Sequence, residues 1–350
     1  MFMQHPRDIL LGAQSASASL PVCDHYSGVE VRMVKSLALQ AEMSQEFGAC
    51  VFDVTLDCED GAPVGGEKDH AHMVVALANK AQEASKRIAS IVPPRVAVRV
   101  HAVDHPAFEQ DVELIVGGAA AALCHVMIPK VETLDDVVRA AKWVDQVAAK
   151  TGRSTPLPLH VLIESPAAVH RAFEIAAHPR VQSLSFGLMD FVSSHGGVIP
   201  ASAMGLSSGH ADLGLDQFSH PLVVRAKLEI SAACHAHGKV PAHCVVTEFS
   251  DVALLQSAAR RASRALGYTR MWSIHPAQIR PILEAFAPLT EEIELASTIL
   301  LAAAQADWAP ISFKGKLHDR ASYRYFWHLL ERAHQTGRTL PDEAQAYFNS

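Results

Sequence analysis

Short apolar runs alternate with longer amphipathic stretches along most of the chain. The apolar, partly alternating runs that predict strands cover residues 50–56, 95–101, 121–128, 157–163, 181–187, 240–247 and 271–274. A further short strand is predicted at residues 9–13. The stretches between these runs repeat their apolar positions at the period of an α-helix, as over residues 133–150 and 251–266. About eight strands that alternate with helices, without the glycine fingerprint of a dinucleotide fold, favour an α/β fold of the (β/α)8 TIM barrel type over a doubly wound sheet.

The pattern changes near residue 290. Helices are predicted over residues 290–306 and 319–335, no strand is predicted in this part, and the remaining tail is polar. The sequence therefore predicts a TIM-barrel catalytic domain over residues 1–289 and a C-terminal helical segment over residues 290–350. Because this segment shows no obvious core of its own, we expect it to pack on the barrel or to reach a neighbouring subunit, as a lid or an oligomerisation element.

Two carboxylates follow two consecutive predicted strands. Glu164 comes directly after the apolar run 157–163, and Asp190 comes shortly after the run 181–187. Since functional sites of parallel α/β folds are built at the carboxyl ends of strands, we expect both side chains to point into one space. Mg²⁺ binds through one or two carboxylates and keeps other positions for water and substrate. The alternative is that Glu164 complements a helix dipole and Asp190 caps a turn.

Acidic and basic groups lie at the ends of two earlier predicted strands. Asp57, Glu59 and Asp60 end the run 50–56, where like charges require hydrogen bonds, solvent or a cation. Arg99 lies late in the run 95–101, and at a barrel mouth its guanidinium could clamp a carboxylate in a bidentate manner. A structural ion pair with one of the acids at residues 57–60 is the alternative, and the two roles are compatible.

Composition narrows the function classes. The 350 residues include 49% hydrophobic residues and carry a formal net charge of -7, and no Lys/Arg stretch is dense enough to follow a nucleic-acid backbone. No run reaches the roughly 18 apolar residues of a membrane span, and the N-terminus lacks the pattern of a leader peptide. The six cysteines form no CxxC pair, which is typical of reduced thiols in a cytoplasmic protein.

Six short motifs occur in the order in which one known enzyme family has them. They are Asp57-Cys-Glu-Asp60 followed by Lys68, Arg99-Val-His101, Pro129-Lys-Val-Glu132, Ile163-Glu-Ser165, Phe186-Gly-Leu-Met-Asp190 and Ile274-His-Pro-Ala-Gln278. Each motif is weak alone, but six in order are specific. On these motifs the chain resembles the HpcH/HpaI aldolase and citrate lyase family, in particular its citrate lyase beta-subunit-like branch, which includes malyl-CoA and citramalyl-CoA lyases. The chain departs from the family pattern at His72, at His101, where Asn is usual, and at His243, where Asp is common.

The resemblance implies a barrel of the phosphoenolpyruvate/pyruvate type and a set of site residues. Glu164 and Asp190 would ligate Mg²⁺, and Glu164 would also face the substrate. Glu59 and Asp60 would belong to the outer shell of the ion. Arg99 would contact the 2-oxo acid and act in catalysis by neutralising developing oxyanion charge.

The resemblance also implies a contribution from a second subunit. Gly315-Lys-Leu-His-Asp319 is similar to a segment that, in the CoA-lyase branch, brings an aspartate into the active site of an adjacent subunit. Asp319 is therefore the candidate catalytic acid or base, with a metal-bound water as the alternative. A helix N-cap is the structural alternative for the same residue. We accordingly expect a homo-oligomer, either a trimer or a hexamer.

The function that the resemblance implies is a Mg²⁺-dependent carbon–carbon lyase. It would cleave or form a 3-hydroxyacyl-CoA thioester, such as citramalyl-CoA, malyl-CoA or a citryl thioester, with an acyl-CoA and a 2-oxo acid as the smaller partners. Two alternatives remain open. One is a metal-dependent aldolase on free 4-hydroxy-2-oxo acids, and the other is a citrate lyase beta-type subunit that works on a thioester carried by a partner protein.

Overall fold

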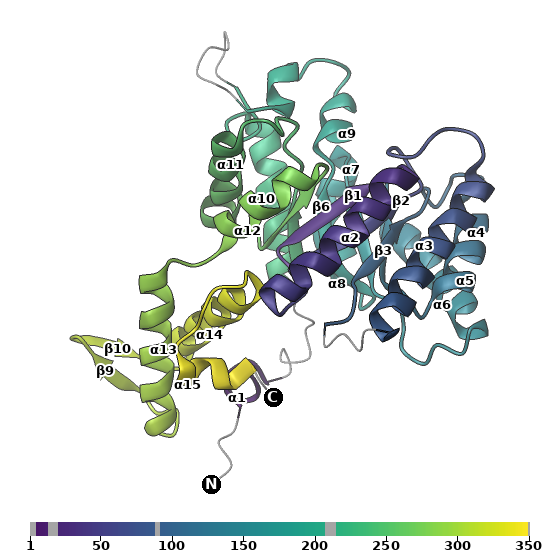
Figure 1. The fold of residues 1–350 in the computed structure, drawn as a ribbon. Coiled ribbons are helices and arrows are strands. Elements are labelled where there is room, and N and C mark those ends of the chain that lie inside the picture. Colours follow the sequence, from purple (N-terminus) through teal and green to yellow (C-terminus); the bar gives the residue numbers. More distant parts are fainter. Residues whose placement is uncertain (1–4, 13–19, 88–91, 207–214, 349–350) are drawn as a thin grey trace.

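The computed structural model describes residues 5–12, 20–87, 92–206 and 215–348, and over these residues the predicted (β/α)8 TIM barrel is confirmed (Figure 1). All eight barrel strands are parallel, and β1 pairs with β8 to close the barrel. The strands are β1 (Cys23–Ser27), β2 (Phe52–Asp57), β3 (Val96–Arg99), β4 (Leu123–Ile128), β5 (Leu159–Ile163), β6 (Val181–Phe186), β7 (Val240–His243) and β8 (Arg270–Ser273).

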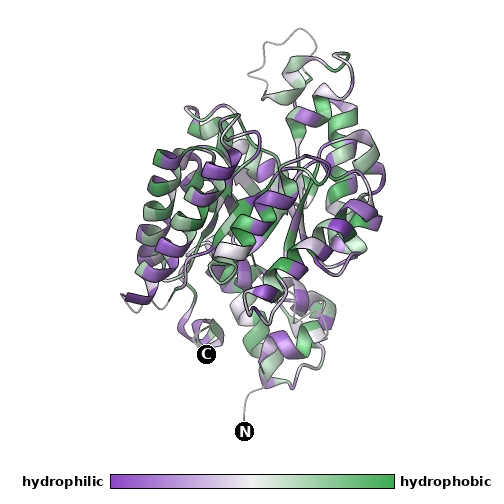
Figure 2. Ribbon diagram, turned by 90° about the vertical axis from the view of Figure 1, so that its right-hand side faces the viewer, coloured by the Kyte–Doolittle hydropathy of each residue, from purple (hydrophilic) through white to green (hydrophobic). Residues whose placement is uncertain are grey.

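Helices surround the closed sheet, and Figure 2 shows the hydrophobic strands enclosed by helices that carry hydrophilic stretches. The longer helices are α2 (Glu30–Phe47), α3 (Glu67–Arg87), α6 (Leu134–Lys150), α10 (Pro221–Ala236), α11 (Val252–Leu266) and α12 (Ile279–Phe286). The shorter ones are α4 (Phe108–Asp111), a π-helix (Val112–Val116), α5 (Gly117–Ala119), α7 (Pro166–His170), α8 (Ala172–Ala177) and α9 (Leu188–Ser193). Their starts follow local chemistry, as in α6, where Thr133 and Asp136 form a capping box.

The first strand differs from the prediction. Residues 9–12 are not extended, because α1 (Pro6–Leu11) begins with a proline in its first turn, and residue 13 lies outside the described part. The first barrel strand is instead β1, whose sequence CDHYS lacks an apolar run. Its polar side chains are nevertheless buried, with Asp24 inside the barrel and His25 hydrogen-bonded to Ser36 of α2 at 3.0 Å. This strand is therefore stabilised by buried polar contacts, and it lacks the apolar run by which the other strands were predicted.

The C-terminal part forms a module with its own hydrophobic core. It contains α13 (Thr290–Gln305), β9 (Ile311–Phe313), β10 (Lys316–His318), α14 (Arg320–Gln335) and α15 (Asp342–Gln345). The expectation of no strand and no core in this part was wrong. The two strands form a hairpin through Lys314 and Gly315, both with positive φ, the backbone that a tight hairpin turn requires.

The core of this C-terminal module also includes the start of the chain. Leu10 and Leu11 of α1 belong to the same buried cluster as Tyr323, Trp327 and Leu330 of α14, whereas the barrel cluster ends at Phe286. The module lies beside the amino-terminal ends of β1, β7 and β8, away from the carboxyl ends where the candidate site lies (Figure 1). It meets the barrel where Gly337 packs on the ring of Phe47 and where Arg264 forms a bidentate ion pair with Glu292.

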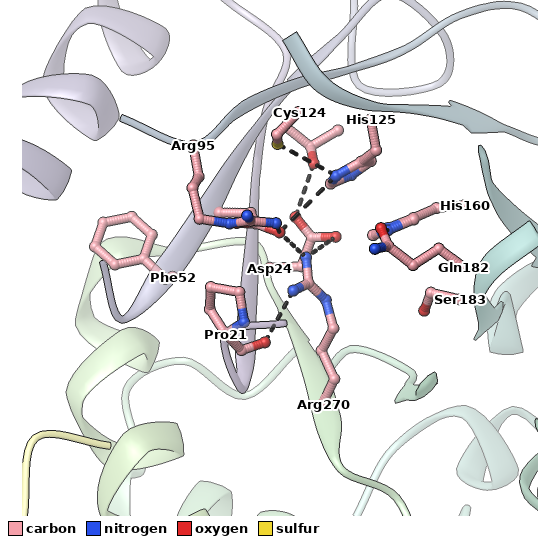
Figure 3. A network of polar contacts seen from close by, with 12 residues as sticks. Pro21, Asp24, Phe52, Arg95, Cys124, His125, His160, Gln182, Ser183 and Arg270 are labelled. Carbon is pink, nitrogen blue, oxygen red and sulfur yellow. Dashed lines mark hydrogen bonds and ion pairs between the residues drawn. The ribbon is translucent and has the colours of Figure 1, made fainter. Parts of the chain in front are cut away.

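A buried ionic network fills the amino-terminal end of the barrel interior, here called the barrel floor (Figure 3). Nη2 of Arg270 lies 2.8 Å from Oδ2 of Asp24 and 2.6 Å from Oδ2 of Asp53. Arg95, the residue before β3, lies 2.5 Å from Asp53, and the rings of His125 and His160 stack beside the network. Buried charges are tolerated only when they are paired, so the two aspartates and the two arginines have to be considered as one unit.

Two further expectations concern the whole chain. All six cysteines are free thiols, and four of them are buried. In the part of the chain that the structure describes, every helix is too short or too polar to cross a membrane.

Candidate active site

A cavity of about 760 Å³ opens at the carboxyl ends of the barrel strands. Its walls come from the segments after β1, β2, β3 and β8, and its charged lining includes Asp57, Asp60 and Arg99, together with Arg32 and Lys35 of α2. This is the mouth at which the sequence predicted the site. The position follows from the fold, because all strands are parallel and their carboxyl ends meet at one end of the barrel.

Arg99 is held rigidly at this cavity. Its Nε donates to Oδ1 of Asp57 at 2.7 Å and its Nη2 donates to Oδ2 of Asp57 at 2.5 Å, while Nη1 lies 3.2 Å from Glu59. Burial alone would lower the pKa of Arg99, but the bonds to Asp57 and the charge of Glu59 raise it above its ordinary value. The guanidinium also lies over the ring of Tyr26, 5.6 Å from its centroid. The structural ion pair is therefore observed, and because Arg99 still lines the cavity, its contact with a substrate carboxylate stays a prediction.

Glu164 and Asp190 lie near each other, as predicted. Glu164 follows β5 and is buried, and its Oε1 accepts the backbone N–H of Lys130 at 2.5 Å. Asp190 lies in the first turn of α9, after β6. Burial, and then the charge of Asp190, raise the pKa of Glu164 to about 8. A cation would stabilise the charged form of Glu164, which burial and the charge of Asp190 disfavour.

Space for the Glu164 carboxylate depends on a glycine. A Cβ atom at Gly187 would lie 2.5 Å from Cβ of Glu164 and 2.7 Å from its Oε2. Gly187 precedes α9, so the turn from β6 into that helix passes directly over Glu164. The glycine of the Phe-Gly-Leu-Met-Asp motif is therefore required by close packing at the site.

Glu59 and Asp60 are placed together with Lys130. Nζ of Lys130 contacts Glu59 and lies 3.2 Å from Asp60, and Glu59 in turn contacts Arg99. Lys130 has a positive φ of 52°, which directs its backbone N–H to Glu164 while its side chain reaches the acids. The pKa of Lys130 is raised, because the bonds and charges of Glu59 and Asp60 outweigh the effect of burial. A charged, paired lysine does not suit a Schiff base.

The donor set at the mouth fits Mg²⁺. Glu164 and Asp190 offer two neighbouring carboxylates, and Glu164 lies within electrostatic reach of Arg99, which lines the cavity. Neither carboxylate is itself a lining residue of that cavity. Elsewhere in the described residues, two groups of three side chains bring possible ligand atoms within 4.8 Å of one another, and both lie at the barrel floor: Asp24, His125 and His160, and Asp53, Cys124 and His125. Those groups do not suit Mg²⁺, since they are rich in nitrogen and sulfur and their aspartates are already paired with Arg270.

Asp319 is not part of the cavity in its own chain. It lies in the C-terminal module, where its Oδ1 accepts the backbone N–H groups of Ala321 and Ser322 at 2.9 and 3.3 Å and caps α14. Figure 1 shows the adjoining hairpin on the side of the module that faces away from the barrel. The N-cap alternative is thus observed, and an active-site role requires a neighbouring subunit.

Several residues at the mouth were absent from the predicted site. Asp57, which orients Arg99, was seen only as one of three clustered acids. Tyr26 and Trp272 stack at 4.6 Å under the cavity, and Arg32 and Lys35 line its rim. The signal for Asp57 was its position directly across from Arg99 in a parallel pair. No comparable signal existed for Tyr26, because β1 was not recognised, nor for the other three, because their position at the cavity depends on the tertiary structure.

Comparison with known proteins supports the resemblance. The profile of the HpcH/HpaI aldolase/citrate lyase family matches residues 33–276, more than half of the chain. The chain belongs to this family. Its members are lyases, and the protein is an enzyme of this type. An L-malyl-CoA/beta-methylmalyl-CoA lyase from Cereibacter sphaeroides is 34% identical over 236 residues, which cover 65% of this chain and 73% of that protein.

Solved structures of the family agree with the fold. A citrate lyase from Burkholderia xenovorans LB400 has 46% sequence identity and a TM-score of 0.78, covering 99% of this chain and 100% of that one. The CitE protein of Mycobacterium tuberculosis, solved in complex with magnesium, acetoacetate and coenzyme A, has 21% identity and a TM-score of 0.61 over 90% of this chain and 98% of that chain. The second likeness shows a shared fold.

Proposed function

We propose that this member of the family is a Mg²⁺-dependent carbon–carbon lyase that cleaves or forms a 3-hydroxyacyl-CoA thioester such as malyl-CoA, citramalyl-CoA or citryl-CoA. The products of cleavage are an acyl-CoA and a 2-oxo acid. The observation that carries the proposal is the meeting of Glu164, Asp190 and Arg99 at the barrel mouth. The names of the malyl-CoA lyase relatives support the thioester class.

Glu164 and Asp190 would hold the ion directly, and Glu59 and Asp60 would hold its water ligands. When bound, Mg²⁺ supplies Lewis-acid polarisation of the oxo acid's carbonyl. The positive charge of Arg99 would act beside that of the ion. The two hydrogen bonds to Asp57 hold the guanidinium in place without any ligand in the cavity. A preorganised guanidinium stabilises oxyanion charge without reorganisation during the reaction.

The rim of the cavity suits the coenzyme half of the substrate. Arg32 and Lys35 lie on one face of α2 at the cavity wall, and neither has an ion-pair partner among the described residues. Coenzyme A carries phosphate groups, which such cations bind by charge-assisted hydrogen bonds. This feature favours a CoA thioester over a free 4-hydroxy-2-oxo acid, which offers no phosphate to this rim.

The remaining acid or base would come from a second copy of the chain. Cleavage leaves an enolate of the thioester that has to be protonated, and Asp319 of an adjacent subunit would be the proton donor. The proposal therefore includes a homo-oligomer, a trimer or a hexamer, in which the hairpin of one C-terminal module covers the cavity of another subunit. Outward placement of the hairpin in Figure 1 is compatible with such a contact.

Direct assay tests the proposal. Purified protein is incubated with malyl-CoA, citramalyl-CoA or citryl-CoA, with Mg²⁺ or with EDTA, and the 2-oxo acid is measured by its reaction with phenylhydrazine. We expect oxo-acid release that requires Mg²⁺ and a CoA thioester. Release from free 4-hydroxy-2-oxo acids alone would favour the aldolase alternative, and turnover only of a thioester on a carrier protein would favour the citrate lyase subunit.

A further inference from the structure

A second cavity lies at the opposite end of the barrel from the proposed active site. It has a volume of about 460 Å³ and separates the barrel floor from the C-terminal module. One wall consists of α1 and α14, including Arg7 and Arg332, and the other consists of the segments that lead into β1, β7 and β8, including Lys239. The cavity therefore lies between the two hydrophobic cores.

The lining of this second cavity is strongly basic. Arg7 and Arg332 come from the module and Lys239 from the barrel, and Glu331 is the acidic residue among its lining side chains. Glu331 is already engaged, at 3.7 Å by Arg7 and at 2.9 Å by His328. No carboxylate that lines the cavity is thus left for the other two cations.

Arg332 and Lys239 are half-buried cations with few partners. In the described ranges, the guanidinium of Arg332 makes no hydrogen bond or ion pair, and Lys239 donates only to the backbone carbonyl of His178 at 3.3 Å. Burial, and then the nearby charge of Arg264, lower the pKa of Arg332. Burial likewise lowers the pKa of Lys239. Both groups are held where their charged forms are poorly compensated, which is a cost that a bound anion would remove.

We propose that this cavity binds a small multivalent oxyanion, a phosphate ester or a polycarboxylate, that bridges Arg332 of the C-terminal module and Lys239 of the barrel. Guanidinium and ammonium groups on opposite walls provide charge-assisted hydrogen bonds to separate oxygens of one ligand. The module and the barrel also contact each other where Gly337 packs on Phe47 and where Arg264 pairs with Glu292. The anion therefore acts as a clamp between the two parts and stabilises the folded protein by linkage.

The test is calorimetric titration of the full-length protein with inorganic pyrophosphate and, separately, with citrate. EDTA replaces Mg²⁺, and the protein carries Arg99→Gln, so that binding at the mouth is suppressed. Each titration is matched in ionic strength with NaCl. Saturable binding of either anion at submillimolar concentration is expected, and tighter binding of pyrophosphate or of citrate distinguishes phosphate from carboxylate recognition.

Variants locate the binding. Arg332→Gln and Lys239→Gln are each expected to weaken the anion by about tenfold, the loss of one charged contact. Arg332→Lys keeps the charge and is expected to retain most of the affinity. Arg324→Gln, an exposed arginine of the same helix, is the control and should bind as the parent does. Thermal unfolding verifies that each variant is folded. Absence of saturable binding in the parent, or unchanged affinity in folded Arg332→Gln and Lys239→Gln, would overturn the proposal, whatever the outcome of the lyase assay.

Discussion

At the scale of single residues, the site depends on pairs whose members come from different strands. Asp57 and Arg99 are register partners of β2 and β3, so the sheet itself positions the two ends of their bidentate contact. Glu164 likewise depends on a backbone N–H from the segment after β4 and on space left by Gly187 after β6. Each functional group is thus oriented by a neighbouring strand and not by its own.

Replacing Asp57 tests the orientation of Arg99. Asp57→Asn removes the charge that fixes the guanidinium, and a displaced catalytic group of this kind costs about 10- to 100-fold in rate. We expect kcat/KM of the proposed lyase reaction to fall by that amount while Mg²⁺ affinity changes little. Asp69→Asn, an exposed aspartate of α3, is the matched control. Unchanged kcat/KM in Asp57→Asn would show that the position of Arg99 does not limit the reaction.

Substitutions of the two proposed ion ligands are expected to lower activity without lowering the stability of the metal-free protein. Glu164→Gln and Asp190→Asn are each expected to reduce Mg²⁺-dependent turnover by about 10³-fold or more, since a Lewis acid supplies several kcal/mol. Without metal, the same variants should unfold at an equal or higher temperature, because one of two repelling carboxylates is gone. Activity and calorimetric Mg²⁺ binding are compared with those of Glu174→Gln, an exposed glutamate of α8. Metal-dependent activity in either ligand variant would refute this ion site.

His101 makes stability depend on pH. Its Nδ1 lies 2.6 Å from Oδ2 of Asp111, and this hydrogen bond raises the pKa of His101 above 6.5. A raised pKa means that the stabilisation is complete below the unfolded value and is lost as the pH rises through the folded value. We therefore expect the free energy of unfolding to fall more steeply in the wild type than in His101→Asn as the pH rises above 6.5. Equal slopes in urea unfolding series would contradict this assignment.

The sequence was enough to select residues that stand at a recognisable place in the chain, such as the end of a predicted strand. It was not enough to select residues whose role depends on a contact made in the folded protein. Glu164 and Asp190 could be identified because each follows an apolar run that can only be a strand. The ion pair of Arg99 could be named only as one of two alternatives, because the choice depends on register. Arg32 and Lys35 could not be assigned, since their role depends on how α2 lies over the mouth.

At the scale of secondary structure elements, the strands that the sequence failed to predict, β1, β9 and β10, all lack a long apolar run. Strand prediction relies on apolar side chains, but β1 buries Asp24 and His25 because the barrel floor and α2 supply polar partners. The hairpin of β9 and β10 has only three residues in each strand and depends on the turn at Lys314 and Gly315. The long helices were predicted correctly, because their periodicity extends over several turns.

The barrel floor provides a stability prediction at this scale. Arg270→Met removes the cation shared by Asp24 and Asp53 and leaves buried negative charge that Arg95 alone, among the described residues, compensates as a cation, which costs about 3–5 kcal/mol. Urea unfolding measures the loss, and Arg260→Met on the exposed face of α11 should change stability by less than about 0.5 kcal/mol. A loss below about 1 kcal/mol in Arg270→Met would show that the floor accommodates unpaired aspartates through water or protonation.

At the scale of the whole molecule, the chain folds as a barrel and a smaller module, in which α1 packs with the C-terminal helices. The division near residue 290 was visible in the pattern, because strands give way to helices there. The contribution of α1 was not visible, since Leu10 and Leu11 pack against residues more than three hundred positions later. His5 strengthens the same contact by donating to the backbone carbonyl of Tyr347 at 2.9 Å. Long-range packing of this kind has no local signature.

The distance of Asp319 from the cavity of its own chain makes the proposed oligomer testable by complementation. Asp319→Asn and Glu164→Gln should each be inactive as pure assemblies. If an aspartate from one subunit serves the cavity of the next, subunits of the two variants that are mixed after reversible dissociation can form sites with both residues intact. Random mixing in equal amounts should restore about a quarter of wild-type activity, because a site needs an Asp319→Asn cavity beside a Glu164→Gln neighbour. Mixtures of Asp319→Asn with Asp190→Asn should behave in the same way, whereas Glu164→Gln with Asp190→Asn should remain inactive, since neither variant retains a complete cavity. No recovery in the first two mixtures would place the proton donor elsewhere and leave Asp319 as the cap of α14.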